Sequence, residues 1–582
     1  MTPAPAVPTG IAIVDSRRLT GPNLLQNRPG PVIDAVCPDG RRVDLAAAWR
    51  EEARLLLAAV GWKGEELSER HFRGGVSLAF SAPVDALYAA TEVNEMAFRS
   101  AAARLIGAYP PDREATAERL IQAIGDERNP ALMALREEAI RRGVAFLSDD
   151  EHVSVGLGSG SVTWPVSELP APAAVDWAAV HDVPVALVTG TNGKTTTVRL
   201  LASIARTAGR VAGMTCTDGI EVGGETIDSG DYSGPGGART VVRDRRVEMA
   251  ILETARGGML RRGLAVTRAD AALVTNVGED HLGEWGVEDL SALADTKMIV
   301  RKAVAERGVL VLNADDATLL ERGLTLGQPL AWYSAGPAAD HVRRHVTEGG
   351  SGALLDADRL VLASGRSNLT TILAVGDLPI ALGGAARHNV SNALAAATVA
   401  SALGMSEGTI AAGLSGFTGD SLRNPGRGNR FDLGGVTVVV DFAHNPHGFR
   451  ALFEMARALP SERLLVLLGQ AGDRDDESIR SLVAETWKAR PDRIVIKEMT
   501  EYLRGRPEGE VAALIESELR RLGAGDDQIE RAASEIDGAR SALRWARKGD
   551  LLLLLSHSSR TVMLKLMARL KDRGWQPGEK LP

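Results

Sequence analysis

The chain contains two series of short apolar runs, and longer amphipathic stretches separate the runs within each series. The first series occupies residues 185–188, 249–253, 272–276 and 309–313, and the second occupies residues 436–441, 464–468, 493–497 and 551–556. Near-continuous aliphatic and β-branched runs between helices are typical of strands buried in a parallel sheet. The pattern therefore predicts two α/β units in the last two thirds of the chain.

Changes in composition indicate where these units begin and end. Residues 419–430 are rich in Gly, Arg, Asn and Pro, which predicts a linker, and three prolines fall within residues 161–177. The segment before them is mixed, with helices expected over 45–60 and 129–142. We expect an N-terminal α+β domain at 1–165, a central α/β domain with a P-loop-type parallel sheet at 166–425, and a C-terminal Rossmann-like α/β domain at 426–582.

Bulk properties narrow the class of protein. The formal net charge of -8 argues against a general nucleic-acid binder, which would carry a basic face. No apolar run approaches the length of a membrane span, and the start of the chain lacks the features of a secretion signal. Two cysteines are too few for a disulfide framework or a zinc site. We expect a cytoplasmic enzyme with neither nucleic-acid nor membrane partners.

The segment 188–197 is built to hold a nucleotide triphosphate. It reads Val-Thr-Gly-Thr-Asn-Gly-Lys-Thr-Thr-Thr and connects an apolar run to an amphipathic stretch. A strand, a glycine turn and a helix N-terminus direct backbone N–H groups at an anion. The general phosphate-loop pattern has a glycine at the position of Val188, so this segment is a shorter variant of the pattern. The alternative interpretation is a glycine turn before a helix that binds no nucleotide. The expected ATP contacts are Gly190, Thr191, Asn192, Gly193, Lys194, Thr195 and Thr196.

Polar residues follow the strands that flank this loop. Glu253 ends one apolar run, Asn276 ends the next, and Asp280 and His281 lie just beyond. Ligands bind at the carboxyl ends of the strands in open α/β sheets, and carboxylates there can hold hard cations against phosphate oxygens. Taken singly, Glu253 could be a strand-end cap and His281 a surface residue. Together they predict metal binding at the triphosphate, with Mg²⁺ on Thr195 and Glu253. The family resemblance described next implies that His281 serves a second metal.

The order of motifs resembles the Mur ligases over roughly residues 184–582. The resemblance rests on residues 190–196, Glu253, residues 276–282, 312–316, 387–393 and 441–446. Residues 229–235, 253–258, 472–474 and 503–510 are most similar to the Mur-like half of cyanophycin synthetases, and residues 17–23 to the start of their N-terminal domain. The ATP-grasp domain of that branch has no counterpart here, so polymerisation is not expected.

The resemblance implies a mechanism and roles for several residues. A substrate carboxylate attacks the γ-phosphate of ATP, and an amine then displaces phosphate from the acyl phosphate. The resemblance implies that Lys194 stabilises the transferred phosphoryl group, that Asn392 faces the adenine and that Asp441 approaches the ribose. Arg427 would reach the phosphates on domain closure, or be a solvated linker charge. Lys297 would be carbamylated beside a second metal, or be a plain helix-surface lysine.

Further residues are candidates for substrate contacts. Asp231 and Arg239 belong to the glycine-rich segment that would handle the acid substrate, and Arg256 could pair with its carboxylates. His444 is expected to contact the ATP-binding domain and not a zinc ion. Asp473 could recognise a cationic amine or be solvated. Arg504 and Arg506 are further substrate candidates because they resemble a motif of the cyanophycin branch, and their spacing alone does not define a role.

The sequence thus predicts an ATP-dependent amide ligase that joins an amino acid to an acidic peptide or amino-acid-like substrate. A peptidoglycan-type ligase acting on a nucleotide-linked precursor is one alternative, and a non-catalytic ATP-binding scaffold is another. The resemblance to the cyanophycin branch, whose enzymes form homo-oligomers, is the only ground for expecting a homo-oligomer. The sequence itself does not indicate a subunit interface.

Overall fold

The computed structural model describes residues 10–37, 40–280, 282–363 and 369–581. Its N-terminal part is a four-stranded antiparallel sheet in the order β1-β2-β4-β3, covered by three helices. Trp49 and Asn94 lie in its core, where the indole donates a 2.8 Å hydrogen bond to the amide oxygen. The elements are β1 (Ala12–Leu19), β2 (Gly30–Val36), α1 (Arg42–Ala59), β3 (Leu67–Phe72), β4 (Gly75–Phe80), α2 (Leu87–Ile106) and α3 (Arg113–Glu127).

A small antiparallel sheet joins this part to the centre of the molecule. It has the order β5-β6-β7 and packs against one helix. The elements are α4 (Pro130–Arg142), β5 (Phe146–Ser148), β6 (His152–Val155) and β7 (Val162–Pro165). The helices expected over 45–60 and 129–142 therefore correspond to α1 and α4. The domain boundaries at 165 and 425 stay predictions.

The central sheet has eleven strands in the order β11-β10-β9-β12-β8-β13-β14-β15-β16-β17-β18. The seven strands from β9 to β16 are parallel, whereas both edges are antiparallel hairpins. The expected parallel sheet is thus present at the centre, and an antiparallel hairpin extends it at each edge. The strands are β8 (Val185–Thr189), β9 (Ala212–Cys216), β10 (Gly219–Val222), β11 (Glu225–Ser229), β12 (Met249–Glu253), β13 (Ala269–Val274), β14 (Val304–Asn313), β15 (Leu330–Ser334), β16 (Ser351–Asp356), β17 (Arg359–Ala363) and β18 (Leu369–Ala374).

Helices cover both faces of this sheet, because side chains of a strand alternate between its two faces. Val185 and Leu187 of β8 belong to one core, and Ala186 and Val188 belong to the other. The first core contains α6 (Pro235–Arg243), α7 (Arg256–Arg262), α8 (Leu290–Lys297), α9 (Ala317–Gly323) and α10 (Ala339–Thr347). The second contains α5 (Lys194–Thr207), α11 (Arg387–Ala402) and α12 (Glu407–Ser415).

The C-terminal part is a six-stranded sheet in the order β19-β20-β24-β21-β22-β23, parallel except for β19. The strands are β19 (Asn429–Leu433), β20 (Val436–Asp441), β21 (Leu464–Leu468), β22 (Arg493–Lys497), β23 (Ile529–Ala532) and β24 (Leu551–Leu555). One face carries α13 (Pro446–Ala458), α14 (Asp476–Lys488) and α15 (Glu510–Arg521). The other carries α16 (Glu535–Trp545) and α17 (Arg560–Asp572).

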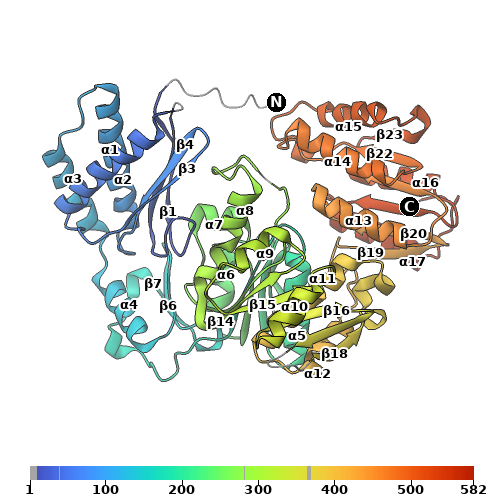
Figure 1. Cartoon of the computed structure of the whole chain (residues 1–582), viewed down its shortest axis with the longest axis horizontal. Helices are drawn as coiled ribbons and strands as arrows, with labels where there is room; N and C mark the ends of the chain where they lie inside the picture. Colours follow the sequence, from blue (N-terminus) through green and yellow to red (C-terminus); the bar gives the residue numbers. More distant parts are fainter. Residues whose placement is uncertain (1–9, 38–39, 281, 364–368, 582) are drawn as a thin grey trace.

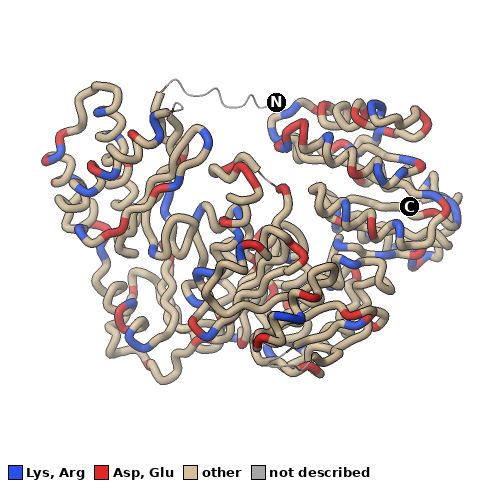
Figure 2. Tube along the Cα trace, in the orientation of Figure 1, with Lys and Arg blue, Asp and Glu red and all other residues tan. Residues whose placement is uncertain are grey.

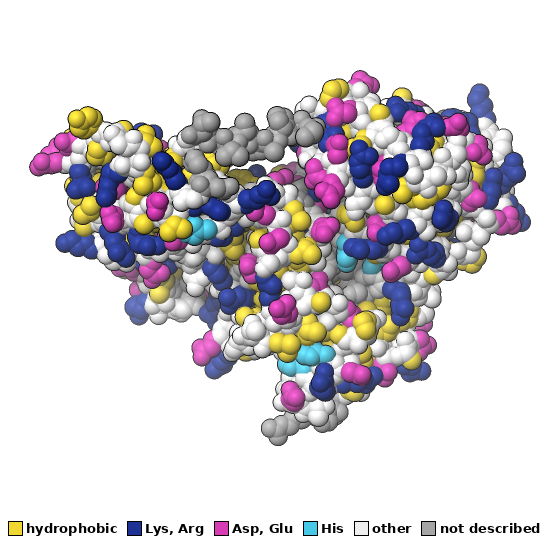
Figure 3. All heavy atoms as spheres, turned by 45° about the horizontal axis from the view of Figure 1, so that its top comes forward, with side chains coloured by type: hydrophobic (Ala, Val, Ile, Leu, Met, Phe, Trp, Pro, Cys, Tyr) yellow, Lys and Arg dark blue, Asp and Glu magenta, His cyan; other side chains and the backbone are white. Residues whose placement is uncertain are grey.

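Figure 1 shows the N-terminal and C-terminal parts on opposite sides of the central sheet. Charged positions of both signs are interspersed along the whole trace (Figure 2) and over the face seen in Figure 3. No helix in the described ranges is long and apolar enough to cross a membrane. The phosphate loop of the central part contacts the C-terminal part, so several of the residues singled out above lie where these two parts meet.

Candidate active site

The loop between β8 and α5 has the shape of a phosphate-binding loop. Gly190 and Gly193 adopt φ of 143° and 85°, a region that side-chain-bearing residues rarely occupy. A Cβ on Gly190 would lie 1.8 Å from the Thr275 hydroxyl, and one on Gly193 would lie 2.3 Å from the Asn392 amide oxygen. Both glycines are therefore required by conformation and by space. Gly193 is the N-cap of α5, so the helix N-terminus opens directly onto the loop.

The neighbouring strand holds this loop in place. The Asn276 amide oxygen accepts from the Asn192 N–H at 2.9 Å, and its amide nitrogen donates to the Asn192 carbonyl at 3.0 Å. The Thr275 hydroxyl also donates to that carbonyl, at 2.6 Å. The expected strand end at Asn276 is wrong, because β13 stops at Val274 and the next two residues turn to bind the loop. Asn276 is thus a residue that positions the loop.

Beneath the loop lies a buried carboxylate. Glu253, at the end of β12, is 1% exposed, and its Oε2 accepts a 2.8 Å hydrogen bond from the Thr195 hydroxyl. Burial raises the pKa of Glu253, while the nearby charge of Lys194 opposes the rise. Its other oxygen, Oε1, is buried and has no hydrogen-bond partner in the described part of the chain. A buried carboxylate oxygen without a donor is costly unless a cation or ligand meets it.

This donor set fits a hard divalent cation, since Mg²⁺ prefers one or two carboxylates together with phosphate oxygens and hydroxyls. Thr195 and Glu253 are the two expected ligands that the structure describes. His281, expected at a second metal, lies outside the described residues. The Lys194 ammonium folds back onto the Thr191 carbonyl at 2.9 Å, and it lies close enough to influence the charge of Glu253.

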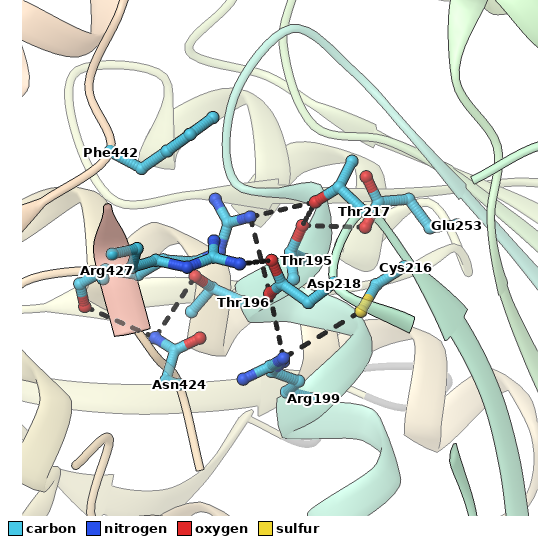
Figure 4. Close-up of polar contacts among 12 residues, drawn as sticks. Thr195, Thr196, Arg199, Cys216, Thr217, Asp218, Glu253, Asn424, Arg427 and Phe442 are labelled. Carbon is cyan, nitrogen blue, oxygen red and sulfur yellow. Dashed lines mark hydrogen bonds and ion pairs between the residues drawn. The ribbon is translucent and has the colours of Figure 1, made fainter. Parts of the chain in front are cut away.

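Three arginines surround one aspartate beside this carboxylate (Figure 4). Asp218 lies 2.9 Å from Arg199 of α5, 3.8 Å from Arg427 of the linker and 2.5 Å from Arg560 at the start of α17. Burial opposes ionisation of Asp218, but the charges of the three arginines lower its pKa below the usual value. The cluster therefore joins the central part, the linker and the C-terminal part around one charge.

Arg427 points into the site and is not a solvated linker charge. It donates a 3.0 Å hydrogen bond to the Thr217 hydroxyl, which lies 3.3 Å from the hydroxyl of Thr195. The Arg427 guanidinium also lies 5.5 Å from the centre of the Phe442 ring, as Figure 4 illustrates. Sequence reasoning missed Thr217 and Asp218. Their position directly after the apolar run of β9 is the signal that could have identified them.

The C-terminal part contacts the phosphate loop itself. The side-chain amides of Asn192 and Asn445 exchange two hydrogen bonds of 3.1 Å, and Nδ1 of His447 lies 3.0 Å from the amide nitrogen of Asn192. Asn445 is buried and also caps α13 by accepting from the Gly448 N–H at 2.8 Å. This asparagine, missed by sequence reasoning, therefore ties the start of α13 to the loop.

Three further candidates lie along this seam. Asp441 accepts a 2.7 Å bond from the Ala443 N–H, and burial raises the pKa of its carboxyl group. Asn392 lies against Gly193 and donates to another side chain of α11, so the structure sets it beside the loop. The imidazole of His444 lies 3.7 Å from Asp280, which also accepts a 2.8 Å bond from Arg474. The roles of these residues toward adenine and ribose stay predictions.

Lys297 is buried at the C-terminal end of α8, with only 4% of its surface exposed. The alternative of a helix-surface lysine is therefore wrong. Burial, reinforced by the charges of Lys194 and Arg256, lowers its pKa to about 7, although Asp280 acts in the opposite direction. Arg256 forms an ion pair with Glu284. Much of the Lys297 population is thus a neutral amine near pH 7.

The remaining substrate candidates lie farther apart. Arg239 donates a 2.7 Å bond to Thr20 of the N-terminal part, and Asp231 accepts from the N–H and hydroxyl of Ser233. In the C-terminal part, the Asp473 and Arg504 side chains are exposed. Arg506 is buried and bonds to Asp476, Glu510 and the carbonyls of Gly472 and Arg474, which gives it a structural role between two loops.

Relatives were found for most of the chain. It is 36% identical to a cyanophycin synthetase of Trichormus variabilis over 395 residues, which is 67% of this chain and 43% of the relative. It is 27% identical to a UDP-N-acetylmuramoyl-L-alanyl-D-glutamate–2,6-diaminopimelate ligase of Geobacter metallireducens, covering 64% of this chain and 73% of that ligase. The chain spans less than half the length of the cyanophycin synthetases it matches.

Among solved structures, E. coli FolC in complex with DHPP and ADP aligns with a TM-score of 0.49 at 21% identity, covering 66% of this chain and 89% of that one. Two family matches follow each other along the chain. Residues 188–400 match the Mur ligase middle domain, and residues 426–557 match the Mur ligase, glutamate ligase domain. Because these two matches together span more than half of the chain, it belongs to the Mur ligase family of acid–amino-acid ligases.

Proposed function

We propose that this chain is an ATP-dependent ligase that activates a substrate carboxylate as an acyl phosphate and joins it to the amine of an amino acid. The observation that carries the proposal is the buried Glu253 carboxylate beneath the phosphate loop, with one oxygen on Thr195 and the other without a partner in the described chain. Mur ligases bind ATP, and the greater identity to cyanophycin synthetases favours their branch over a peptidoglycan-type ligase.

The proposal assigns the nucleotide to the loop of residues 190–196. The N-terminus of α5 and the Lys194 ammonium would bind its phosphates, because both offer positive charge to anionic oxygens. Thr195 and Glu253 would hold Mg²⁺, which would neutralise charge on the phosphates when bound. Arg427, whose guanidinium donates a 3.0 Å hydrogen bond to Thr217, would add a second cation at the phosphates.

In the first chemical step, a carboxylate oxygen of the acid attacks the γ-phosphorus of ATP, and the bond to the ADP oxygen breaks. In the second, the neutral amine nitrogen attacks the acyl carbon, and inorganic phosphate leaves with the electron pair of the carbon–oxygen bond. The protein supplies mainly orientation and charge neutralisation. The contact between Asn192 and Asn445 would keep the C-terminal part over the loop and exclude water that hydrolyses the acyl phosphate.

The test is phosphate release with ATP and Mg²⁺ against a matrix of carboxylic acids and amino acids, including aspartate-rich peptides, with mass spectrometry of each product. We expect turnover that requires one acid and one amine, a condensation product, and loss of both in Lys194→Ala. Lys571→Ala, on the exposed side of α17, is the matched control and should keep full turnover. Tight ATP binding without stimulated turnover across the matrix would refute the ligase and favour a nucleotide-binding scaffold.

A further inference from the structure

The C-terminal part contains a buried ion pair that the proposed mechanism does not use. Lys497, the last residue of β22, lies 2.5 Å from Glu535, the first residue of α16, and their side chains are 0% and 1% exposed. Two buried charges are costly unless further hydrogen bonds satisfy them. The three N–H groups of the Lys497 ammonium meet three acceptors, which are Glu535, the carbonyl of Leu555 at 2.6 Å and Nδ1 of His557 at 3.1 Å. The lysine is therefore fully bonded.

Glu535 holds the turn between β24 and α17. Its carboxylate accepts from the Ser556 hydroxyl and from the backbone N–H groups of the next three residues, at 2.9, 3.3 and 3.0 Å. Burial opposes ionisation of Glu535, but the charge of Lys497 lowers its pKa below the usual value. The turn leads directly into Arg560, which reaches Asp218 of the central part. The buried pair thus fixes a turn that ends at the seam with the central part.

His557, within this turn, connects the buried pair to a second loop. Its Nε2 lies 2.9 Å from the carbonyl oxygen of Ala443, between β20 and α13. A carbonyl oxygen only accepts, so Nε2 carries the proton and Nδ1 accepts from Lys497. Burial and the charge of Lys497 lower the pKa of His557 well below its usual value, which keeps the ring neutral. The ring therefore bridges a buried cation and a loop carbonyl, with one nitrogen committed to each.

The loop that contains Ala443 meets the phosphate loop two residues later. There the side-chain amide of Asn445 exchanges two hydrogen bonds of 3.1 Å with that of Asn192. The carbonyl after that of Ala443, which belongs to His444, accepts a 2.8 Å bond from the Gln470 amide. Two consecutive carbonyls of this loop are thus held by side chains of the C-terminal part, just before the residue that contacts the phosphate loop.

We propose that His557, anchored by Lys497 and Glu535, is a positioning residue that holds residues 441–446 in the conformation that meets the phosphate loop. The inference rests on the proposed function for the nucleotide at that loop, and it adds a residue that acts through the protein and not by touching the nucleotide. Without the bond to Ala443 the loop has other conformations available. The apparent affinity for nucleotide then falls with the fraction of molecules that is competent to bind.

Two substitutions separate the contact with Ala443 from the place of His557 in the core. In His557→Gln an amide nitrogen reaches the position of Nε2 and still donates to Ala443, whereas the shorter side chain of His557→Asn can only accept from Lys497. His557→Asn should therefore weaken the binding of fluorescent ADP with Mg²⁺ about fivefold, as expected for one lost hydrogen bond. His557→Gln should bind nearly as the wild type does. Both variants keep the buried ion pair, so both are expected to fold.

His345→Asn is the matched control, because it also removes a contact between a histidine and a carbonyl. Nε2 of His345 lies 3.1 Å from the carbonyl of Leu330, the first residue of β15, at the end of the parallel strands opposite to the phosphate loop. In urea unfolding it should lose about as much stability as His557→Asn, yet bind ADP as the wild type does. Backbone hydrogen exchange over residues 189–197, measured without nucleotide, should be about fivefold faster in His557→Asn and unchanged in His345→Asn.

A double-mutant cycle with Asn445→Ala tests whether His557 acts through the loop. In the Asn445→Ala background, His557→Asn should weaken ADP binding by less than about twofold further, because the contact that it positions is already lost. Effects of the two substitutions that multiply would overturn the inference, as would equal ADP binding by His557→Asn and His557→Gln. The expected binding pattern without ligation of any tested acid and amine would refute the proposed function and leave this inference standing. A wild type that binds no ADP would refute both.

Discussion

Replacing Lys297 with methionine is expected to stabilise the protein at neutral pH while abolishing ligation. The amine is buried and lies among the charges of Lys194, Arg256 and Asp280. Methionine has a similar length, carries no charge and packs well in apolar surroundings. The substitution therefore removes a group whose protonation opposes folding, and it also removes the amine that the resemblance to Mur ligases places, carbamylated, beside a second metal.

The size of the effect follows from the pKa of Lys297, which burial lowers from 10.5 to about 7. Between these values the unfolded chain binds a proton that the folded protein does not, so wild-type stability rises with pH across this window. One pKa unit corresponds to about 1.4 kcal/mol, which makes the penalty about 4 kcal/mol at pH 7.5 and about 1.4 kcal/mol at pH 9.5. The stability advantage of Lys297→Met should therefore shrink by about 2.5 kcal/mol between these two conditions.

Urea unfolding of both proteins at the two pH values, in buffers free of carbon dioxide, measures this difference. Lys571→Met, at an exposed position, is the control and should show no such change with pH. An advantage that is the same at both pH values would refute the reasoning. Bicarbonate provides a further test, since a neutral amine adds carbon dioxide and releases a proton to give an anionic carbamate. If Lys297 is carbamylated, bicarbonate should stabilise the wild type, leave the variant unchanged and raise the wild-type mass by one carbon dioxide in native mass spectrometry.

Three other substitutions test the site. Glu253→Gln should lower the ligation rate at least about hundredfold while fluorescent-nucleotide binding without Mg²⁺ persists, and a retained rate would contradict the proposed metal role. Asp218→Asn should raise the KM for ATP about tenfold, because the Arg427 guanidinium loses its charged partner; an unchanged KM in steady-state kinetics would argue against that positioning. Asn445→Ala removes a helix cap and both bonds to Asn192, so it should lower stability by about 1 kcal/mol and raise the ratio of phosphate released to product formed. If the ratio of phosphate to product stays at one in the variant, the contact between Asn192 and Asn445 does not serve to exclude water.

The sequence identified the buried strands well, for a physical reason. Four predicted runs, 249–253, 436–441, 464–468 and 493–497, have the bounds of β12, β20, β21 and β22. These strands are buried on both faces, so the residues at their centres are apolar. The antiparallel hairpins at both edges were missed, and β11 lacks the apolar signal altogether, because all five of its residues are exposed. Edge strands are held mainly by main-chain hydrogen bonds, which leave little trace in the order of side-chain types.

The phosphate loop was identifiable because its constraints are local. Gly190 and Gly193 are imposed by backbone conformation and close neighbours, and the helix begins at the next residue. The Asp218 cluster was not identifiable, since its arginines come from positions 199, 427 and 560 and meet only after three parts of the chain have folded. No spacing rule connects such residues. Only the placement of Thr217 and Asp218 after an apolar run hinted that they face the site.

The contacts between the C-terminal part and the central part have a consequence for nucleotide exchange. They are mostly polar: Asn192 with Asn445, Asp280 with Arg474, and Asp218 with Arg560. In the described chain, residues 382, 385 and 386 add apolar contact across this seam by packing with the core of the C-terminal part. Each polar contact contributes a net of about 0.5–1.5 kcal/mol, because water replaces it on opening. Separating the parts therefore costs only a few kcal/mol, little enough for the seam to open for ADP release and to close again over ATP.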